Sequence, residues 1–436
     1  MEKILHFIKK LVPRKIFTFF QPVYHFSLAL LGAIVNRFPA KNLYIIGVTG
    51  TKGKSTVTEI VNAILEEAGY KTAVSNTIRF KIGNKSKPNK YKMSMPGRFF
   101  MQNFLRRAVK EGCTHAVVEI TSEGSKQFRH KFIWLDTFIF TNLAPEHIES
   151  HGSFEKYRKA KLKIADNLLK KAEKKKHDGM LSGIMVVNSD DKEAKVFLNQ
   201  VPDRRIKKVT YSISDATPIR YGKQTEMRFY KTTLYSALPG EFNVSNILAA
   251  ATFADTVGID HQIIKSAVEN LKEIPGRVQK VNVGQNFDVI VDYAHTIESL
   301  TQLYEAFSNK TKICVLGNTG GGRDKWKRPR MAKVAEEYCK EIILTNEDPY
   351  DEDPEKIVNE MSATIKNKTA QIIMDRREAI NTAIRKAKDN PTPEETVVLI
   401  SGKGTDPYIM EANGKKTPWS DYEVAKEELE KVVGKK

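Results

Sequence analysis

Residues 47–56 read Gly-Val-Thr-Gly-Thr-Lys-Gly-Lys-Ser-Thr, and the apolar run 43–48 leads into them. Behind them apolar residues recur at helical spacing, at Val57, Ile60, Val61, Ile64 and Leu65. A strand, a glycine-rich loop and an amphipathic helix in this order predict a phosphate-binding loop, because glycines let backbone N–H groups approach phosphate oxygens. We expect Lys54 to reach the β- and γ-phosphates of a nucleotide, and the Ser55 hydroxyl to bind Mg²⁺.

Further apolar runs alternate with helix-like segments, which predicts βαβ units around mainly parallel sheets. The expected strands are 43–48, 116–120, 138–140, 184–187, 289–291, 313–316, 342–344 and 397–400. Pro275 and Gly276 break the helix-like run 262–273. We therefore expect an α/β protein with an apolar, basic segment (1–40), a central P-loop ATPase domain (41–275) and a C-terminal Rossmann-like domain (276–436).

The charge balance is strongly basic, with 71 Lys and Arg against 52 Asp and Glu in 436 residues. The 41% hydrophobic and 28% charged residues exclude a disordered or fibrous protein and a membrane protein with many spans. A net charge of +19 fits nucleic acid, anionic lipid or polyanionic substrates, and charge alone does not choose among them.

The three cysteines, Cys113, Cys314 and Cys339, are far apart and form no CxxC pair. This spacing predicts neither a zinc site nor a disulfide framework, and it favours a reducing compartment. Cys314 lies in the apolar run 313–316, so we interpret it as a small buried core residue.

Residues 1–40 differ from the rest of the chain. Lys9, Lys10, Arg14 and Lys15 precede the uncharged run 16–36. Three interpretations stay open: a helix packed on the protein's own body, a basic and aromatic segment on an anionic membrane surface, or a membrane span. A nucleotide site follows and requires cytosolic ATP, so we expect a cytoplasmic protein, with the inner face of the membrane as an open alternative.

Polar clusters follow the expected strands, where ligands bind in open α/β sheets. Glu119 ends a buried strand, and such a carboxylate needs a cation, either Mg²⁺ or a neighbouring Lys or Arg. After 138–140 come Glu146, His147, Glu149 and His151, a density that favours metal or phosphate chemistry. The C-terminal clusters lie at 292–296, 320–325, 346–349 and 402–406. Their mixed charges suit an amino-acid-like ligand better than nucleic acid.

These motifs, in this order, resemble the Mur ligase family over residues 42–421. The residues that carry the resemblance are GVTGTKGKST from 47, TNLAPEHIESHG from 141, YRKAK from 157, GEFNVSN from 240, VDYAHT from 291, GGGRDKWKRPRM from 320 and SGKGTD from 401. Several are weak alone, but the ordered set is specific. The resemblance is strongest to the members that add the third peptide residue of peptidoglycan precursors.

The resemblance implies an ATP-dependent amide ligase that works through an acyl phosphate. It implies nucleotide binding by Gly50, Thr51, Lys52, Gly53, Lys54, Ser55, Thr56, Asn243, Asn246, Arg277, Asp292 and His295. It implies Mg²⁺ ligation by Ser55, Glu119, His147 and Lys161, with Lys161 carbamylated, and catalytic roles for Lys54, Lys161, His147 and Glu119. It implies substrate binding by Thr121, Ser122, Arg129, Arg323, Asp348, Gly402 and Asp406. The expected partners are ATP, an amino acid and a muramoyl-peptide-like acceptor, with no nucleic acid, and the expected state is a monomer.

Two departures from the family pattern affect the substrates. About forty residues precede the loop where the family has a UDP-binding domain, so a different or lipid-linked acceptor is an open alternative. Glu347-Asp348-Pro349-Tyr350 stands where the enzymes that add diaminopimelate carry Asp-Asn-Pro-Arg. Without the arginine clamp for a distal carboxylate, the pattern favours lysine or another diamino acid, and Asp406 keeps a carboxylate for its amine.

One hypothesis of a different class remains. The basic charge and the N-terminal segment would also suit a membrane-surface P-loop ATPase. Such an ATPase would turn over ATP without any amino acid, whereas the ligase needs both acceptor and amino acid to release ADP.

Overall fold

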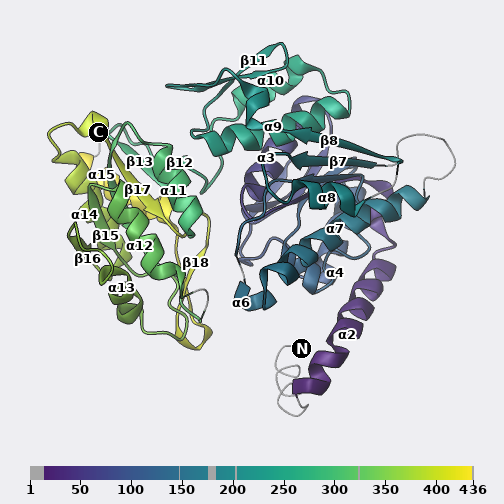
Figure 1. The fold of residues 1–436 in the computed structure, drawn as a ribbon, viewed down its shortest axis with the longest axis horizontal. Helices are drawn as coiled ribbons and strands as arrows, with labels where there is room; N and C mark the ends of the chain where they lie inside the picture. Colours follow the sequence, from purple (N-terminus) through teal and green to yellow (C-terminus); the bar gives the residue numbers. More distant parts are fainter. Residues whose placement is uncertain (1–13, 147, 175–182, 202–203, 323–324, 435–436) are drawn as a thin grey trace. The chain divides into compact units, whose positions relative to one another are not determined.

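The computed structural model describes residues 14–146, 148–174, 183–201, 204–322 and 325–434. The chain forms two compact units (Figure 1). Unit 1 comprises Met1–Ala144, Phe154–Ser212 and Ala249–Asp260, and unit 2 comprises Pro145–Ser153, Ile213–Leu248 and His261–Lys436.

Unit 1 is built on an eight-stranded sheet of order β4-β3-β2-β5-β1-β6-β7-β8. The strands are β1 (Tyr44–Thr49), β2 (Thr72–Ser75), β3 (Arg79–Ile82), β4 (Lys85–Pro88), β5 (His115–Glu119), β6 (Thr137–Phe140), β7 (Gly183–Asn188) and β8 (Ile206–Tyr211). From β2 to β8 along the sheet, all neighbours are parallel, whereas β3 and β4 form an antiparallel edge. The predicted parallel strands are therefore confirmed. Because β1 lies between β5 and β6, the residues that follow these three strands meet at one edge.

Two helical segments of unit 1 precede its first strand, and the others lie between successive strands. These segments are α2 (Arg14–Val35), η1 (Pro39–Asn42), α3 (Lys54–Glu67), α4 (Arg98–Lys110), α5 (Ser122–Lys126), α7 (Phe154–Lys174) and α8 (Ala194–Gln200). All five residues of the predicted apolar stripe of α3 are buried. A second apolar core joins the sheet to α4, α7 and α8, with Phe104, Ile164 and Phe197 among its members.

Unit 2 contains a six-stranded sheet of order β12-β13-β17-β14-β15-β16, parallel except for β12. Its strands are β12 (Gln279–Lys280), β13 (Asp288–Asp292), β14 (Thr311–Leu316), β15 (Glu341–Leu344), β16 (Ala370–Ile372) and β17 (Thr396–Ser401). Its helices are α6 (Ile148–His151), α10 (His261–Asn270), α11 (Ile297–Glu305), α12 (Lys327–Tyr338), α13 (Pro354–Ser362), α14 (Arg376–Lys388) and α15 (Asp421–Val433). This sheet confirms the predicted second α/β fold.

The remaining elements of unit 2 are small. They are η2 (Ile213–Ala216), β9 (Arg220–Tyr221), β10 (Thr225–Phe229), β11 (Thr232–Ser236), η3 (Pro393–Glu395), β18 (Tyr408–Met410), η4 (Ala412–Gly414) and β19 (Lys416–Pro418). Helix α9 (Glu241–Thr256) begins in unit 2 and continues into unit 1.

The N-terminal segment forms a helix that packs on the protein itself. Ala29 and Ala33 of α2 are fully buried, and a Cβ added to Gly32 would lie 3.4 Å from the Cα of Phe99 in α4. Within the described ranges, no helix has the length and apolar content needed to cross a membrane, which contradicts the membrane-span interpretation.

Cys314 and Cys339 form a disulfide, so the expectation of no disulfide is wrong. Their Cα atoms are 6.1 Å apart, within the usual range for such a bond. The residues are 25 positions apart in the sequence, and the α12 crossover brings them together just before β15 pairs with β14. Cys314 is also buried in the core, as expected, and Cys113 is a free, buried cysteine.

Candidate active site

The glycine-rich loop connects β1 to α3, as predicted. Gly53 adopts a left-handed conformation with φ of 78° immediately before α3 begins at Lys54. A Cβ on Gly50 would lie 1.9 Å from Oγ1 of Thr141, so no side chain fits there. The loop therefore has the strand–turn–helix geometry that exposes backbone N–H groups to a phosphate.

The residues after β6 hold the loop in shape. Asn142 accepts hydrogen bonds from Thr51 N through its backbone oxygen and from Lys52 N through its side chain, both at 2.8 Å. Oγ1 of Thr141 donates to the backbone oxygen of Lys52 at 2.6 Å. The sequence shows Thr141 and Asn142 only as part of a motif. That they support the loop could not be predicted, because their contacts with it span 89 and 90 residues of sequence.

Two lysine side chains reach the backbone of the loop. Lys54 Nζ donates to the oxygen of Thr51 at 2.8 Å, and Lys161 Nζ donates to the oxygen of Gly50 at 2.6 Å. Lys161 belongs to α7 and is only 2% exposed, although a helix lysine is usually exposed to solvent. The ring of Tyr157 lies 4.8 Å from the Lys161 nitrogen, and the Tyr157 hydroxyl is 3.0 Å from that of Thr51.

Glu119, at the end of β5, is buried and bound by hydroxyl groups. Ser55 Oγ donates to its Oε2 at 2.7 Å, and Ser94 Oγ donates to its Oε1 at 2.8 Å. The backbone N–H and the hydroxyl of Thr77 donate at 3.0 Å. Burial raises the pKa of the Glu119 carboxyl, but the charge of Lys54 and these hydrogen bonds outweigh burial and hold the pKa below its ordinary value. The group is thus an anionic oxygen ligand beside the phosphate loop.

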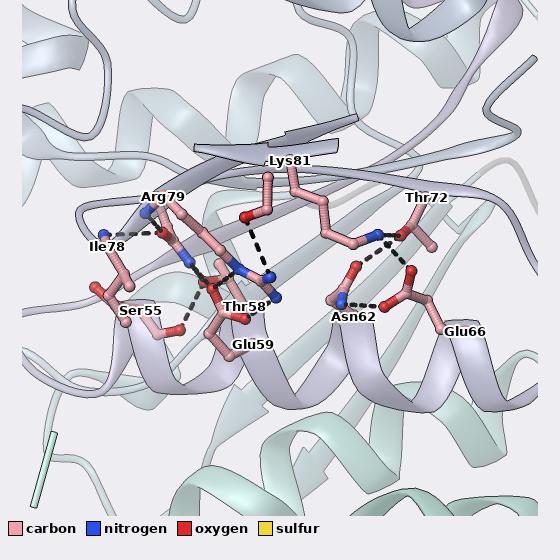
Figure 2. Close-up of polar contacts among 11 residues, drawn as sticks. Ser55, Thr58, Glu59, Asn62, Glu66, Thr72, Ile78, Arg79 and Lys81 are labelled. Carbon is pink, nitrogen blue, oxygen red and sulfur yellow. Dashed lines mark hydrogen bonds and ion pairs between the residues drawn. The ribbon is translucent and has the colours of Figure 1, made fainter. Parts of the chain in front are cut away.

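A polar network joins α3 to β2, to β3 and to the turn between these strands (Figure 2). Glu59 accepts two hydrogen bonds from Arg79, at 3.0 and 2.5 Å, and one from Asn76 at 2.8 Å. Asn76 in turn accepts from the backbone N–H groups of Ile78 and Arg79. Further along the helix, Glu66 pairs with Lys81 and Asn62 accepts from Thr72. This network was not anticipated from the sequence, and it fixes the turn at residue 77 against the helix that begins at the loop.

Oxygen ligands suit Mg²⁺, so Ser55 and Glu119 fit the predicted magnesium site. Within the part of the chain that the structure describes, no group of three or more His, Cys, Asp and Glu side chains is arranged to hold a metal. The predicted ligand His147 lies outside the described residues, as does the predicted substrate residue Arg323. Glu146 and His151 are buried, and Glu149 is exposed.

The predicted substrate-binding residues of unit 1 lie in α5 and at its two ends. Thr121 caps this helix by accepting from Gly124 N at 3.0 Å, and Ser122 is buried. Arg129 follows the helix and donates to Gln127 Oε1 at 2.7 Å. Burial, and then the positive charge of Arg129, lower the pKa of Arg98 to about 10, so two guanidinium groups lie close to each other here.

The predicted nucleotide residues of unit 2 fall into two groups. Asp292 accepts from Val278 N and Ala294 N, both at 2.7 Å, and the guanidinium of Arg277 lies 4.5 Å from the Tyr293 ring centroid. His295 Nδ1 is 2.7 Å from the oxygen of Tyr293. The second group is on α9, where Asn246 donates to the side chain of Asn243 at 3.2 Å.

Of the predicted substrate-binding residues of unit 2, the structure describes Asp348, Gly402 and Asp406, and these lie around Lys403. This fully buried lysine donates to Asp348 at 2.7 Å, and Asp406 lies 3.5 Å from its nitrogen. Gly402 approaches Glu347 so closely that a Cβ would lie 2.3 Å from Oε2 of that carboxyl group. Burial raises the pKa of Glu347 above its ordinary value. Three acids around one lysine form a site that suits a cationic group of a ligand.

Two family models match the chain. The Mur ligase middle domain matches residues 48–254, and the Mur ligase, glutamate ligase domain matches residues 276–404. UDP-N-acetylmuramoyl-L-alanyl-D-glutamate–2,6-diaminopimelate ligase of Syntrophomonas wolfei is 34% identical over 398 residues, covering 88% of this chain and 78% of the relative. UDP-N-acetylmuramyl-tripeptide synthetase of Roseiflexus sp. is 32% identical over 424 residues, covering 92% and 82%.

Solved structures show the same fold. A UDP-N-acetylmuramoyl-L-alanyl-D-glutamate–2,6-diaminopimelate ligase matches with a TM-score of 0.60 and 28% identity, covering 90% of this chain and 79% of that one. Folylpolyglutamate synthase of Mycobacterium tuberculosis matches in fold alone, with a TM-score of 0.68 and 14% identity, covering 87% and 93%. This chain therefore belongs to the Mur ligase family, whose members are ATP-dependent, ADP-forming carbon–nitrogen ligases.

Proposed function

We propose that the chain joins an amino acid to a carboxylate of a UDP-N-acetylmuramoyl-peptide-like acceptor in peptidoglycan precursor synthesis. The observation that supports this most is the buried Lys161 side chain, which donates to Gly50 of the phosphate loop across 111 residues of sequence. A P-loop alone would serve any nucleotide hydrolase. A ligase must also hold the anionic acceptor at the phosphates, and a second, buried lysine at the loop suits that task.

The reaction proceeds in two steps. A carboxylate oxygen of the acceptor attacks the γ-phosphorus of ATP, the bond to ADP breaks, and an acyl phosphate forms. The amine of the incoming amino acid then attacks the acyl carbon, loses a proton and expels phosphate. Lys54 contributes positive charge at the transferred phosphoryl group, and the loop N–H groups orient it, because phosphoryl transfer depends on positioning and charge neutralisation.

Magnesium is held, in this proposal, by Ser55, Glu119, His147 and a carbamylated Lys161. The neutral Lys161 amine adds to CO₂ to give a carbamate and releases a proton. The carbamate nitrogen keeps one N–H, so the hydrogen bond to the Gly50 oxygen is retained while a carboxylate-like group is added. When bound, Mg²⁺ supplies charge neutralisation to the phosphate oxygens.

The added amino acid is lysine or another diamino acid. Asp348 and Asp406 supply negative charge for an ammonium group, and Tyr350 stands where an arginine would clamp a distal carboxylate. Gly402 and Arg323 complete this site. Asn243, Asn246, Arg277, Asp292 and His295 bind the nucleotide.

The acceptor is bound by Thr121, Ser122 and Arg129. A lipid-linked or otherwise different carboxylate acceptor is a second candidate, and one contact favours it. His25 of the apolar helix α2 contacts Arg98, and Arg98 lies close to Arg129. We also propose that one chain is the working unit, that it acts in the cytoplasm, and that residues 1–40 make peripheral contact with the inner face of the membrane.

ADP release with a panel of amino acids tests the function. The assay contains ATP, Mg²⁺ and UDP-N-acetylmuramoyl dipeptide, and each amino acid is added singly. We expect ADP only when both acceptor and amino acid are present, with lysine or another diamino acid the fastest. ADP release with ATP alone, or none from any combination, would contradict the proposal.

A further inference from the structure

Helix α2 has one face that is packed on the protein. Ala29, Gly32 and Ala33 lie against α4, and the Asn36 side chain donates to the oxygen of Gly32 at 2.8 Å. Small residues allow this close approach of the two helices. This packed face explains why the helix belongs to unit 1. It buries only one side of the helix, although apolar residues occur on the other side as well.

The opposite face carries large apolar side chains in contact with solvent. We call it the apolar stripe, and its members and exposed fractions are Phe20 (57%), Val23 (62%), Tyr24 (43%), Leu31 (50%), Ile34 (52%) and Val35 (63%). At about 100° per residue these six positions fall within one third of the helix circumference. Ser27 is the one polar residue in that sector. A soluble surface gains nothing from such a stripe, so it indicates an interaction surface.

The stripe stands out from the rest of the described surface. Elsewhere exposed large apolar side chains occur singly or in groups of two or three, as with Tyr91 and Met93, Tyr230 at the β10–β11 turn, Val257 after α9 and Ile372 in β16. Single exposed apolar residues are ordinary and need no partner. A continuous row along one helix, in contrast, requires an occupant that covers it as a whole.

Charge identifies the occupant. Residues 3–58 contain no Asp or Glu, and α4, which packs on α2, contains none either. Exposed basic side chains flank the helices at Arg37, Lys41, Arg107 and Lys110. Two copies of this surface would bring like charges together, whereas lipid phosphates would neutralise them.

We propose that α2 lies flat on an anionic phospholipid surface, with the apolar stripe in the boundary between headgroups and acyl chains. The exposed Arg37 and Lys41, which follow the helix, are placed to meet the headgroup phosphates. The inference rests on the membrane contact proposed above and supplies its surface and its lipid class. It does not depend on the ligase chemistry.

Vesicle flotation of the full chain tests the proposal. The vesicles are phosphatidylglycerol mixed with phosphatidylcholine, and phosphatidylcholine alone. The stripe variant carries Val23→Glu, Leu31→Glu and Val35→Glu. The control carries the same charge change at Tyr230→Glu, Val257→Glu and Ile372→Glu. We expect the wild type and the control to float with the anionic vesicles, and the stripe variant to lose at least about tenfold in partitioning. Neutral vesicles and high salt should weaken binding of the wild type.

Three results would overturn the proposal: no flotation of the wild type with anionic vesicles, equal flotation of the wild type and the stripe variant, or a wild-type dimer that the stripe variant abolishes without any lipid binding. ADP release without vesicles separates this proposal from the ligase function. A chain that floats but releases no ADP contradicts the ligase proposal alone. A chain that releases ADP but does not float contradicts the lipid surface alone.

Discussion

The hydroxyl of Ser55 donates a 2.7 Å hydrogen bond to the carboxylate of Glu119, 64 residues further along the chain. The contact joins the first turn of α3 to the end of β5. Two oxygen atoms that are suited to one magnesium ion therefore lie within contact distance of each other, and the carboxylate is already ionised because the pKa of Glu119 is held below its ordinary value.

Glu119→Gln keeps the size of the side chain but removes its charge and replaces one of its two acceptor oxygens with a donor NH2 group. We expect kcat to fall on the order of a hundredfold and the Mg²⁺ concentration for half-maximal rate to rise. ADP release measured across a magnesium titration gives both quantities. Glu66→Gln, at the exposed C-terminal end of α3, should leave the titration unchanged. An unaltered magnesium dependence in Glu119→Gln would remove this residue from the metal site.

Lys161→Ala should abolish turnover, because it removes both the donor to Gly50 and the group proposed to carry the carbamate. Acetate or another small carboxylate should restore part of the rate if the missing group is a carboxylate. Lys159→Ala is the matched control, since Lys159 is exposed on the same helix. Wild-type activity in Lys161→Ala would exclude the carbamate.

Glu59→Ala should destabilise unit 1. The Glu59 side chain is 6% exposed and accepts from the buried Asn76 and from Arg79, which is 28% exposed. Loss of this acceptor should cost about 2 kcal/mol. Glu111→Ala, which breaks an exposed pair with Lys85, should cost less than about 1 kcal/mol. Urea unfolding measures both changes. Similar values for the two variants would show that the network is not a source of stability.

The stability of unit 2 should depend on the ionisation of Glu352. Its carboxylate accepts from Gly322 N at 2.6 Å and contacts Arg328 at 3.0 Å, and despite partial burial these contacts lower its pKa to about 2 from the ordinary 4.5. A depressed pKa stabilises the fold above the unfolded value, and that contribution is lost as pH falls from 4.5 towards 2. In Glu352→Gln the slope of unfolding free energy against pH should be smaller in this window. The decrease should correspond to up to about one proton taken up on unfolding. The exposed Glu355→Gln should keep the wild-type slope.

Reduction of the Cys314–Cys339 bond should lower the free energy of unfolding by up to about 3 kcal/mol, because the bond closes a loop in the unfolded chain. Thiol titration in denaturant should find one free thiol, that of Cys113, before reduction, and three afterwards. If three thiols react from the start, the bond is absent from the purified protein.

The sequence was sufficient for the architecture because its signals are local. The apolar runs that end in Val48, Phe140 and Ile400 form parallel strands, and the predicted apolar face of α3 is buried. The glycines of the loop predicted a turn whose backbone conformation and close contacts favour glycine. In each case the pattern needs no information about distant parts of the chain.

The missed features depend on distance in the sequence. Thr77 and Ser94 bind Glu119 from segments that carry no motif, and nothing near Cys314 announces Cys339. From the residues alone Lys161 would be an exposed helix lysine, because its burial depends on the contact of α7 with the loop after β1. For α2, the sequence alone could not show which residues of the apolar run pack on the protein and which are exposed on the opposite face.

The close contact of Gly50 with Thr141, and the hydrogen bonds from Thr141 and Asn142 to the loop, have a thermodynamic consequence for nucleotide binding. The loop is shaped by hydrogen bonds from the end of β6, so the chain orders it while folding and not when ATP arrives. Binding then requires little loss of backbone entropy, and the affinity for nucleotide reflects the phosphate contacts themselves. Loosening these contacts, for example with Asn142→Ala, would transfer that ordering to the binding step and weaken affinity without removing any phosphate ligand.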